Sequence, residues 1–206
     1  MKTFRMTATL ARHATNPFAT RHTRPGSIPP LDDEGQPRNL EKLLTAIDQL
    51  GSSAAIRGPH GTGKSTLLVA LAEILADRGE RVRCLRIRRP GGAWLVTGAL
   101  RRMPPGGILC LDSWDELGNL ARLLVTLQAR LRGVRLLVTS HRTGLLPTLV
   151  RTRGTPAVLA GIVRRLPGEA GLLNEADLAA AFARHHGNLR ESLASLYDRI
   201  EERRRP

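Results

Sequence analysis

Apolar residues follow two patterns along this chain of 206 residues, and each pattern predicts one kind of element. Segments in which apolar side chains recur every three or four positions are typical of helices, and they lie at 39–50, 65–78, 93–102 and 117–132. Short continuous apolar runs are typical of buried strands, and they lie at 53–57, 81–88, 107–112 and 134–140. A short helix is expected at 145–151 and a fifth strand at about 157–163.

Strand and helix alternate through this part of the chain, which favours a mainly parallel sheet. The sequence therefore predicts an α/β core over 39–166, with a five-stranded sheet and helices on both faces. Residues 1–38 are rich in Arg, Thr and Pro, which predicts an extended basic arm. Residues 167–206 are expected to form a small appendage of two helices, at 175–184 and 189–203.

Composition gives an expectation for the cellular location. The sequence has no run of about 18 apolar residues, so it predicts no membrane-spanning helix. Residues 1–14 lack the continuous apolar segment of a secretory signal, and we expect a cytoplasmic protein. Cys84 and Cys110 fall in predicted strands, where buried, reduced thiols are expected.

The chain is strongly basic, with a formal net charge of +14. This excess favours a polyanionic partner, most commonly nucleic acid, or else a generally basic surface. Arginines gather on and just after the second predicted strand, at Arg81, Arg83, Arg86, Arg88 and Arg89. With the arm and Arg203-Arg204-Arg205 they can follow the phosphates of duplex DNA, or they can be a charged sheet edge that blocks strand pairing. Aromatic residues make up only 3% of the chain, so stacking on single-stranded bases is not expected.

The most informative motif lies between the first strand and the following helix, at Gly58-Pro59-His60-Gly61-Thr62-Gly63-Lys64-Ser65-Thr66. The glycines allow the backbone to curl so that N–H groups point at phosphate oxygens, and Lys64 adds a positive charge for the outer phosphates. The Ser65 hydroxyl can bind the Mg²⁺ that accompanies a nucleotide. The sequence therefore predicts a phosphate-binding loop (P-loop) for a nucleoside triphosphate.

Acidic residues follow the apolar run 108–111. Asp112 ends this predicted central strand, where it can hold Mg²⁺ together with Ser65. Asp115 and Glu116 come just after it, where either can polarise an attacking water. Acidic residues also favour the start of a helix, so a purely structural role for both stays open.

The strand at 134–140 ends in Thr139-Ser140-His141-Arg142. In open parallel sheets, ligands bind at the carboxyl ends of strands. Thr139 or Ser140 can therefore orient water or sense the γ-phosphate, and Arg142 can supply charge to this nucleotide or to one in a neighbouring subunit. A strand-end turn without ligand contact is the alternative.

These motifs, in this order, resemble the additional-strand (ASCE) class of P-loop NTPases, and within it the AAA+ and STAND (NACHT-like) ATPases. Leu-Asp112-Ser-Trp-Asp-Glu116 is similar to the Asp-x-x-Asp-Glu of STAND proteins, and Thr139-Ser-His-Arg142 is similar to their Thr-Ser-Arg strand with His141 added. AAA+ relatives usually have Glu where this chain has Ser113.

The resemblance implies a three-layer P-loop NTPase fold, with ATP and Mg²⁺ as cofactors. It implies that Lys64, Ser65 and Asp112 are the phosphate and magnesium residues, and that Thr139 or Ser140 is a sensor. Gly187-Asn-Leu-Arg190 is similar to the start of the AAA+ sensor-2 helix, which implies that Arg190 reaches the γ-phosphate; an ordinary corner between helices explains the same residues.

Three functions remain open at this stage. The first is a Mg²⁺-dependent ATPase that drives conformational change or assembly, with a protein partner or as a homo-oligomer. The second is a nucleotide-gated adaptor that binds DNA or protein and hydrolyses little. The third, a small-molecule kinase, is disfavoured because Arg86-Ile-Arg-Arg89 ends the second strand without a carboxylate. The sequence lacks the Asn-Lys-x-Asp motif that recognises guanine, so adenine is the expected base of the nucleotide.

Overall fold

The structure is a computed structural model, and it describes residues 16–23, 25–51, 53–88, 92–166 and 173–203. The described residues form two compact units. One unit is Asn39–Thr152, and the other combines the residues up to Arg38 with those from Arg153 onward. The predictions made for 1–15, Arg89 and Arg204-Arg205 lie outside the described residues.

The unit Asn39–Thr152 is built on a five-stranded parallel sheet with the order β2-β3-β4-β1-β5. Its strands are β1 (Ala54–Arg57), β2 (Val82–Arg86), β3 (Ile108–Asp112), β4 (Arg135–Ser140) and β5 (Thr148–Arg151). Its helices are α3 (Leu40–Leu50), α4 (Lys64–Asp77), α5 (Ala93–Arg102) and α6 (Asn119–Leu131), with the short 3-10 helix η1 (Trp114–Glu116) after β3. The first four strands and these four α-helices lie where the sequence predicts them.

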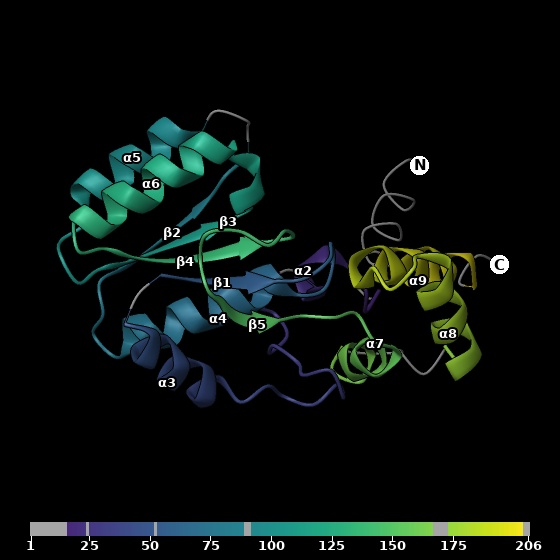
Figure 1. Ribbon diagram of the computed structural model, residues 1–206. Coiled ribbons are helices and arrows are strands. Elements are labelled where there is room, and N and C mark those ends of the chain that lie inside the picture. The colour runs from purple at the N-terminus through teal and green to yellow at the C-terminus, as the bar shows by residue number, and fades with distance from the viewer. Residues whose placement is uncertain (1–15, 24, 52, 89–91, 167–172, 204–206) are drawn as a thin grey trace, which may run out of the picture. The chain divides into compact units, whose positions relative to one another are not determined.

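Helices cover both faces of the sheet, α5 and α6 on one and α3 and α4 on the other (Figure 1). Successive side chains of a strand point to opposite faces. Leu109 and Leu111 of β3 accordingly pack with α5 and α6, whereas Ile108 and Cys110 pack with α3 and α4. The apolar run that predicts β3 is continuous because both of its faces are buried.

β2 lies at the edge of the sheet, as expected, and it is only partly buried. Cys84 of β2 is opposite Cys110 of β3 in the register, and both thiols are free. The prediction that both are buried is right for Cys110 and wrong for Cys84, because an edge strand has a neighbour on one side only.

The end of the core differs from the prediction, since 145–151 is not a helix. β5 lies there instead and pairs in parallel with β1, with Val150 opposite Ile56. Pro147 precedes this strand, and its carbonyl accepts a hydrogen bond from the N–H of Ala55. The partner strand, which is distant in sequence, decides the conformation here.

The strand expected at 157–163 is also wrong, because this segment forms helix α7 (Pro156–Val163). Thr155 caps the helix by accepting a hydrogen bond from the N–H of Val158 at 3.1 Å. Pro156 occupies the first turn, where its missing N–H is not needed.

The second unit contains α2 (Thr20–Thr23), α7, α8 (Glu175–Arg184) and α9 (Leu189–Arg203), and the last two helices have the predicted bounds. Its core joins Phe18 to apolar residues of α7, α8 and α9. Asn16 is fully buried and donates to Glu201 of α9 at 2.7 Å. The described part of the predicted arm is therefore packed, because Phe18 and Asn16 have partners more than 100 residues away.

None of the described helices is both long and apolar enough to cross a bilayer.

Candidate functional site

The P-loop joins β1 to α4, and three of its glycines have backbone angles that favour glycine. Gly58, Gly61 and Gly63 have φ of 156°, 72° and 86°, which side chains disfavour. Gly58 also lacks space, since a Cβ there would lie 2.3 Å from the carbonyl oxygen of Thr152. Gly63 is the N-cap of α4, so the first N–H groups of this helix adjoin the loop.

Lys64 is the first residue of α4, and its side chain turns back over the loop. It is 7% exposed, and its Nζ donates to the carbonyl oxygens of Gly58 at 2.8 Å and Pro59 at 2.5 Å. Thr62 is buried as well, and its hydroxyl lies 2.7 Å from that of Thr152, which follows β5. Hydrogen bonds from the side chains of Lys64 and Thr62 thus stabilise the conformation of the loop. The backbone N–H groups of the loop are the expected phosphate ligands.

Asp112 lies beside this loop and contacts one side chain from each of α4, β4 and β2. Its Oδ1 accepts hydrogen bonds from Ser65 Oγ at 2.8 Å and from Thr139 Oγ1 at 2.7 Å. Thr139 is buried and also accepts the N–H of Ser113 at 2.9 Å, which fixes the chain just after Asp112. The structure brings together the oxygens of Ser65 and Asp112, which are hard ligands of the kind that Mg²⁺ prefers, and the magnesium site stays a prediction.

Arg86 of β2 also belongs to this cluster, and the sequence did not predict its contact with Asp112. Its Nε lies 3.5 Å from Asp112 Oδ2. The parallel register sets Arg86 opposite Asp112, so the ends of these two strands adjoin. The sequence places Arg86 at the end of a strand, but its pairing with Asp112 depends on the register of β2 against β3.

Asp115 and Glu116 differ sharply in their surroundings. Asp115 is held by Ser140 Oγ at 2.9 Å, by the N–H of His141, and by Arg122 at 3.4 Å. The side chain of Glu116 is exposed and makes no hydrogen bond or ion pair within the described residues. Asp115 thus joins η1 to the end of β4, whereas the exposed Glu116 has no such contact among the described residues.

The end of β4 contacts the P-loop through a histidine pair. The rings of His141 and His60 lie 3.5 Å apart between centroids, and His141 Nδ1 is 3.2 Å from the carbonyl oxygen of Gly58. Burial and the charge of Lys64 lower the pKa of His141, so the neutral ring is favoured near neutral pH. His141, which the sequence analysis treated as an added residue, therefore links the two motifs.

Two further predicted residues are exposed arginines, Arg142 and Arg190. Arg142 is exposed, and its N–H bonds to Ser140 Oγ at 3.1 Å. Arg190 is exposed on α9 in the second unit. Their predicted contacts with the γ-phosphate stay predictions.

Solved structures of RuvB from Thermotoga maritima share this architecture. One, described as the Holliday junction branch migration motor, has a TM-score of 0.52 and 19% identity over 79% of this chain and 59% of RuvB. A proline-to-glycine mutant of the same protein has a TM-score of 0.55 and 18% identity over 84% of this chain and 63% of RuvB. The chain has the P-loop NTPase fold that these RuvB structures share.

The match leaves part of RuvB without a counterpart, because the chain spans about 60% of the length of these RuvB structures. Aquifex aeolicus DnaA with bound AMPPCP has a lower TM-score, 0.46, at 17% identity over 80% of this chain and 64% of DnaA. No family model matches the chain, and no curated protein matches its sequence. At such identities the AAA+ likeness concerns the fold.

Proposed function

We propose that this protein is a Mg²⁺-dependent ATPase of AAA+ or STAND-like type that couples ATP binding and hydrolysis to conformational change or assembly. The contact between Ser65 Oγ and Asp112 Oδ1 at 2.8 Å carries the proposal, because it unites the two magnesium ligands beside a P-loop. The AAA+ fold supports it.

Each residue of the cluster has a defined task in this proposal. The P-loop N–H groups and Lys64 bind the phosphates of ATP, while Ser65 and Asp112 hold Mg²⁺, which neutralises phosphate charge. Thr139 fixes the Asp112 carboxylate through its hydrogen bond, and it is a positioning residue. Glu116 accepts a proton from the attacking water as the water oxygen bonds to the γ-phosphorus, while the bond from this phosphorus to the β,γ-bridging oxygen breaks and ADP leaves.

Glu116→Gln is expected to bind ATP as the parent protein does and to hydrolyse it about 100-fold more slowly, since an amide does not accept the proton. Steady-state ATP turnover and the affinity for a fluorescent ATP analogue measure the two effects. Glu73→Gln is the matched control, because Glu73 is also exposed and lies on α4 away from the carboxyl ends of the strands. Equal turnover in the parent and in Glu116→Gln would remove this residue from the mechanism.

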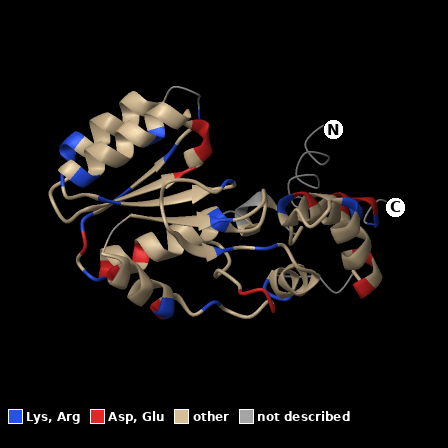
Figure 2. Ribbon diagram, in the orientation of Figure 1, with Lys and Arg blue, Asp and Glu red and all other residues tan. Residues whose placement is uncertain are grey.

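A second candidate function is a nucleotide-gated adaptor that binds duplex DNA. The exposed arginines of β2 and its flanks favour it, and Figure 2 shows their blue positions on this edge strand. Guanidinium groups bind phosphate in bidentate fashion. RuvB of Thermotoga maritima, a Holliday junction branch migration motor, is consistent with a DNA partner for this fold.

Replacing both Arg81 and Arg83 by glutamine is expected to reduce the salt dependence of duplex binding, by about two in the slope of log affinity against log salt. Fluorescence anisotropy with a labelled duplex between about 50 mM and about 200 mM salt measures this slope. The matched control replaces the exposed Arg164 and Arg184, which belong to the other unit. An affinity that does not change with salt argues against phosphate contacts. If the rate of ATP turnover is the same with and without duplex DNA, the ATPase activity is not linked to DNA binding.

A further inference from the structure

Helix α6 packs its smaller apolar residues against the core and turns its larger ones to solvent. Ala121, Val125 and Ala129 pack with α5 and the sheet. The largest apolar side chains of a surface helix ordinarily face the core. On α6 a row of leucines, each between 51% and 78% exposed, faces solvent instead: Leu120, Leu124, Leu127 and Leu131. This row, the leucine stripe, is an apolar surface of the kind that marks a binding site for another protein.

The spacing of the leucine stripe suits a second copy of the same helix. Its residues are four, three and four positions apart, which is the spacing of the contact positions in paired helices. This order reads the same in both directions. When two α6 helices run antiparallel, Leu120 lies opposite Leu131 of the second copy, and Leu124 lies opposite Leu127. Contacts about a two-fold axis need such self-complementarity.

The charges around the stripe differ between its two ends. Neither α5 nor α6 contains Asp or Glu, and their exposed arginines gather at the C-terminal ends of both helices (Figure 2). These arginines are Arg101, Arg102, Arg130 and Arg132. Arg132 joins the two ends, since its Nε donates to the carbonyl oxygen of Leu100 at 3.0 Å. The exposed Glu116 lies just before the other end of α6.

This distribution of charge selects the antiparallel orientation. An antiparallel pair brings the arginine end of each copy to the Glu116 end of the other, whereas a parallel pair sets arginines against arginines. α6 has 13 residues and is about 20 Å long, so antiparallel copies keep their arginine groups farther apart than the Debye length of about 8 Å. The repulsion between two basic chains is therefore screened in this arrangement.

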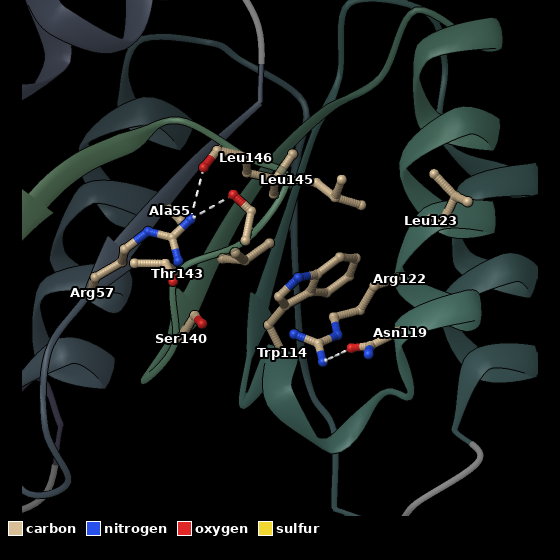
Figure 3. A pocket seen from close by; sticks show the side chains of 12 residues that line it. Ala55, Arg57, Trp114, Asn119, Arg122, Leu123, Ser140, Thr143, Leu145 and Leu146 are labelled. Atoms are coloured by element: carbon tan, nitrogen blue, oxygen red, sulfur yellow. Dashed lines mark hydrogen bonds between the residues drawn. The ribbon is translucent and has the colours of Figure 1, made fainter.

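The other arginine of α6 does not lie on the stripe. Arg122 lines a cavity bounded by α6, β1 and β4 (Figure 3). There it forms an ion pair with Asp115 at 3.4 Å and a hydrogen bond with Asn119 at 2.5 Å. Its charge is thus compensated within the chain and does not oppose the approach of a second copy.

We propose that the leucine stripe binds the leucine stripe of a second copy of this chain, with the two α6 helices antiparallel about a two-fold axis. The proposal rests on the fold and not on ATP binding, so its failure would leave the proposed function untouched. α5 and α6 together present a face of about 20 Å by 20 Å, or about 400 Å² per copy. A standard interface buries about 800 Å² per copy, so a reversible dimer with a micromolar dissociation constant is expected.

Sedimentation velocity of the full chain, without nucleotide, from about 1 µM to about 200 µM is expected to show a monomer–dimer equilibrium. Leu124 and Leu127 are half-exposed, so their joint replacement by glutamate leaves the core intact and puts four carboxylates at the centre of the interface. The dissociation constant is expected to rise at least about 30-fold. Leu50→Glu is the matched control, because Leu50 is an exposed leucine of α3, on the opposite face of the sheet. A monomer at every concentration, or a dimer that the double variant does not weaken, would overturn the proposal.

Cysteine pairs test the orientation in a Cys84→Ser background, which removes the exposed native thiol and keeps the buried Cys110. Leu120→Cys and Leu131→Cys are made as separate proteins. Mixed and mildly oxidised, they are expected to form a disulfide with each other, whereas neither links to itself. In an antiparallel pair each cysteine lies about 16 Å along the axis from its own counterpart, beyond the Cα separation of about 7 Å that a disulfide spans. Self-linked dimers of Leu131→Cys, or no link in the mixture, would overturn the antiparallel stripe.

Discussion

Lys64→Ala is expected to abolish detectable ATP binding, through a loss of affinity of at least about 100-fold. Lys64 is buried at the start of α4, and its Nζ already lies among the loop carbonyls of Gly58 and Pro59. Lys64 is the only lysine within the loop Gly58–Thr66, so in the proposed complex it supplies the lysine charge that the loop offers to phosphate. Alanine removes the charge and the hydrogen-bond donors together.

Isothermal titration with ATP and Mg²⁺ measures the loss. Lys42→Ala is the matched control, since Lys42 is exposed on α3 and its replacement leaves the loop unchanged. Lys64→Met keeps the length of the side chain without its charge, and it is expected to lose binding as alanine does. Binding retained in Lys64→Met, with a cooperative unfolding transition, would contradict the assignment of the loop.

Asp112→Asn is expected to lower ATP turnover by about 100-fold or more, with a smaller effect on ATP affinity. The carboxylate accepts hydrogen bonds from the hydroxyls of Ser65 and Thr139 and forms an ion pair with Arg86. Asparagine has the same size but no charge with which to hold Mg²⁺. The variant should therefore also require more Mg²⁺ to reach its remaining rate.

Turnover measured over a series of Mg²⁺ concentrations distinguishes this effect from general damage. Asp77→Asn, at the exposed end of α4, makes the same chemical change away from the site. An Asp112→Asn protein with the parent rate and the parent Mg²⁺ dependence would show that Asp112 serves the fold alone. The unfolding midpoint in urea, recorded for both variants, separates lost chemistry from lost stability.

The parts of the site that are local in sequence could be predicted, and those that depend on distant contacts could not. The spacing of Gly58, Gly61 and Gly63 indicates the P-loop because each glycine meets a local backbone demand. Asp112 is predicted from its position at the end of a buried apolar strand. The pairing of Arg86 with Asp112, by contrast, needs the register of β2 against β3, which the periodicity of apolar residues does not give.

The same distinction explains the misassigned segments. The apolar run 157–163 is short and contains β-branched residues, so its pattern fits a strand or a helix equally. Thr155 and Pro156 were the local signals that favour a helix there. Phe18 has no comparable signal, because its partners lie in the last third of the chain.

Two independent structural constraints require glycine at position 58. They affect how the conservation of Gly58 in related sequences should be interpreted. The backbone of the phosphate loop needs its φ of 156°, and the carbonyl of Thr152 leaves no room for a side chain. A descendant of this protein that had lost nucleotide binding would still be selected to keep glycine here while Thr152 kept its place beside the loop. In divergent sequences, Lys64 and Ser65 are therefore the informative markers of retained nucleotide chemistry, and the first glycine of the loop reports on packing against the end of β5.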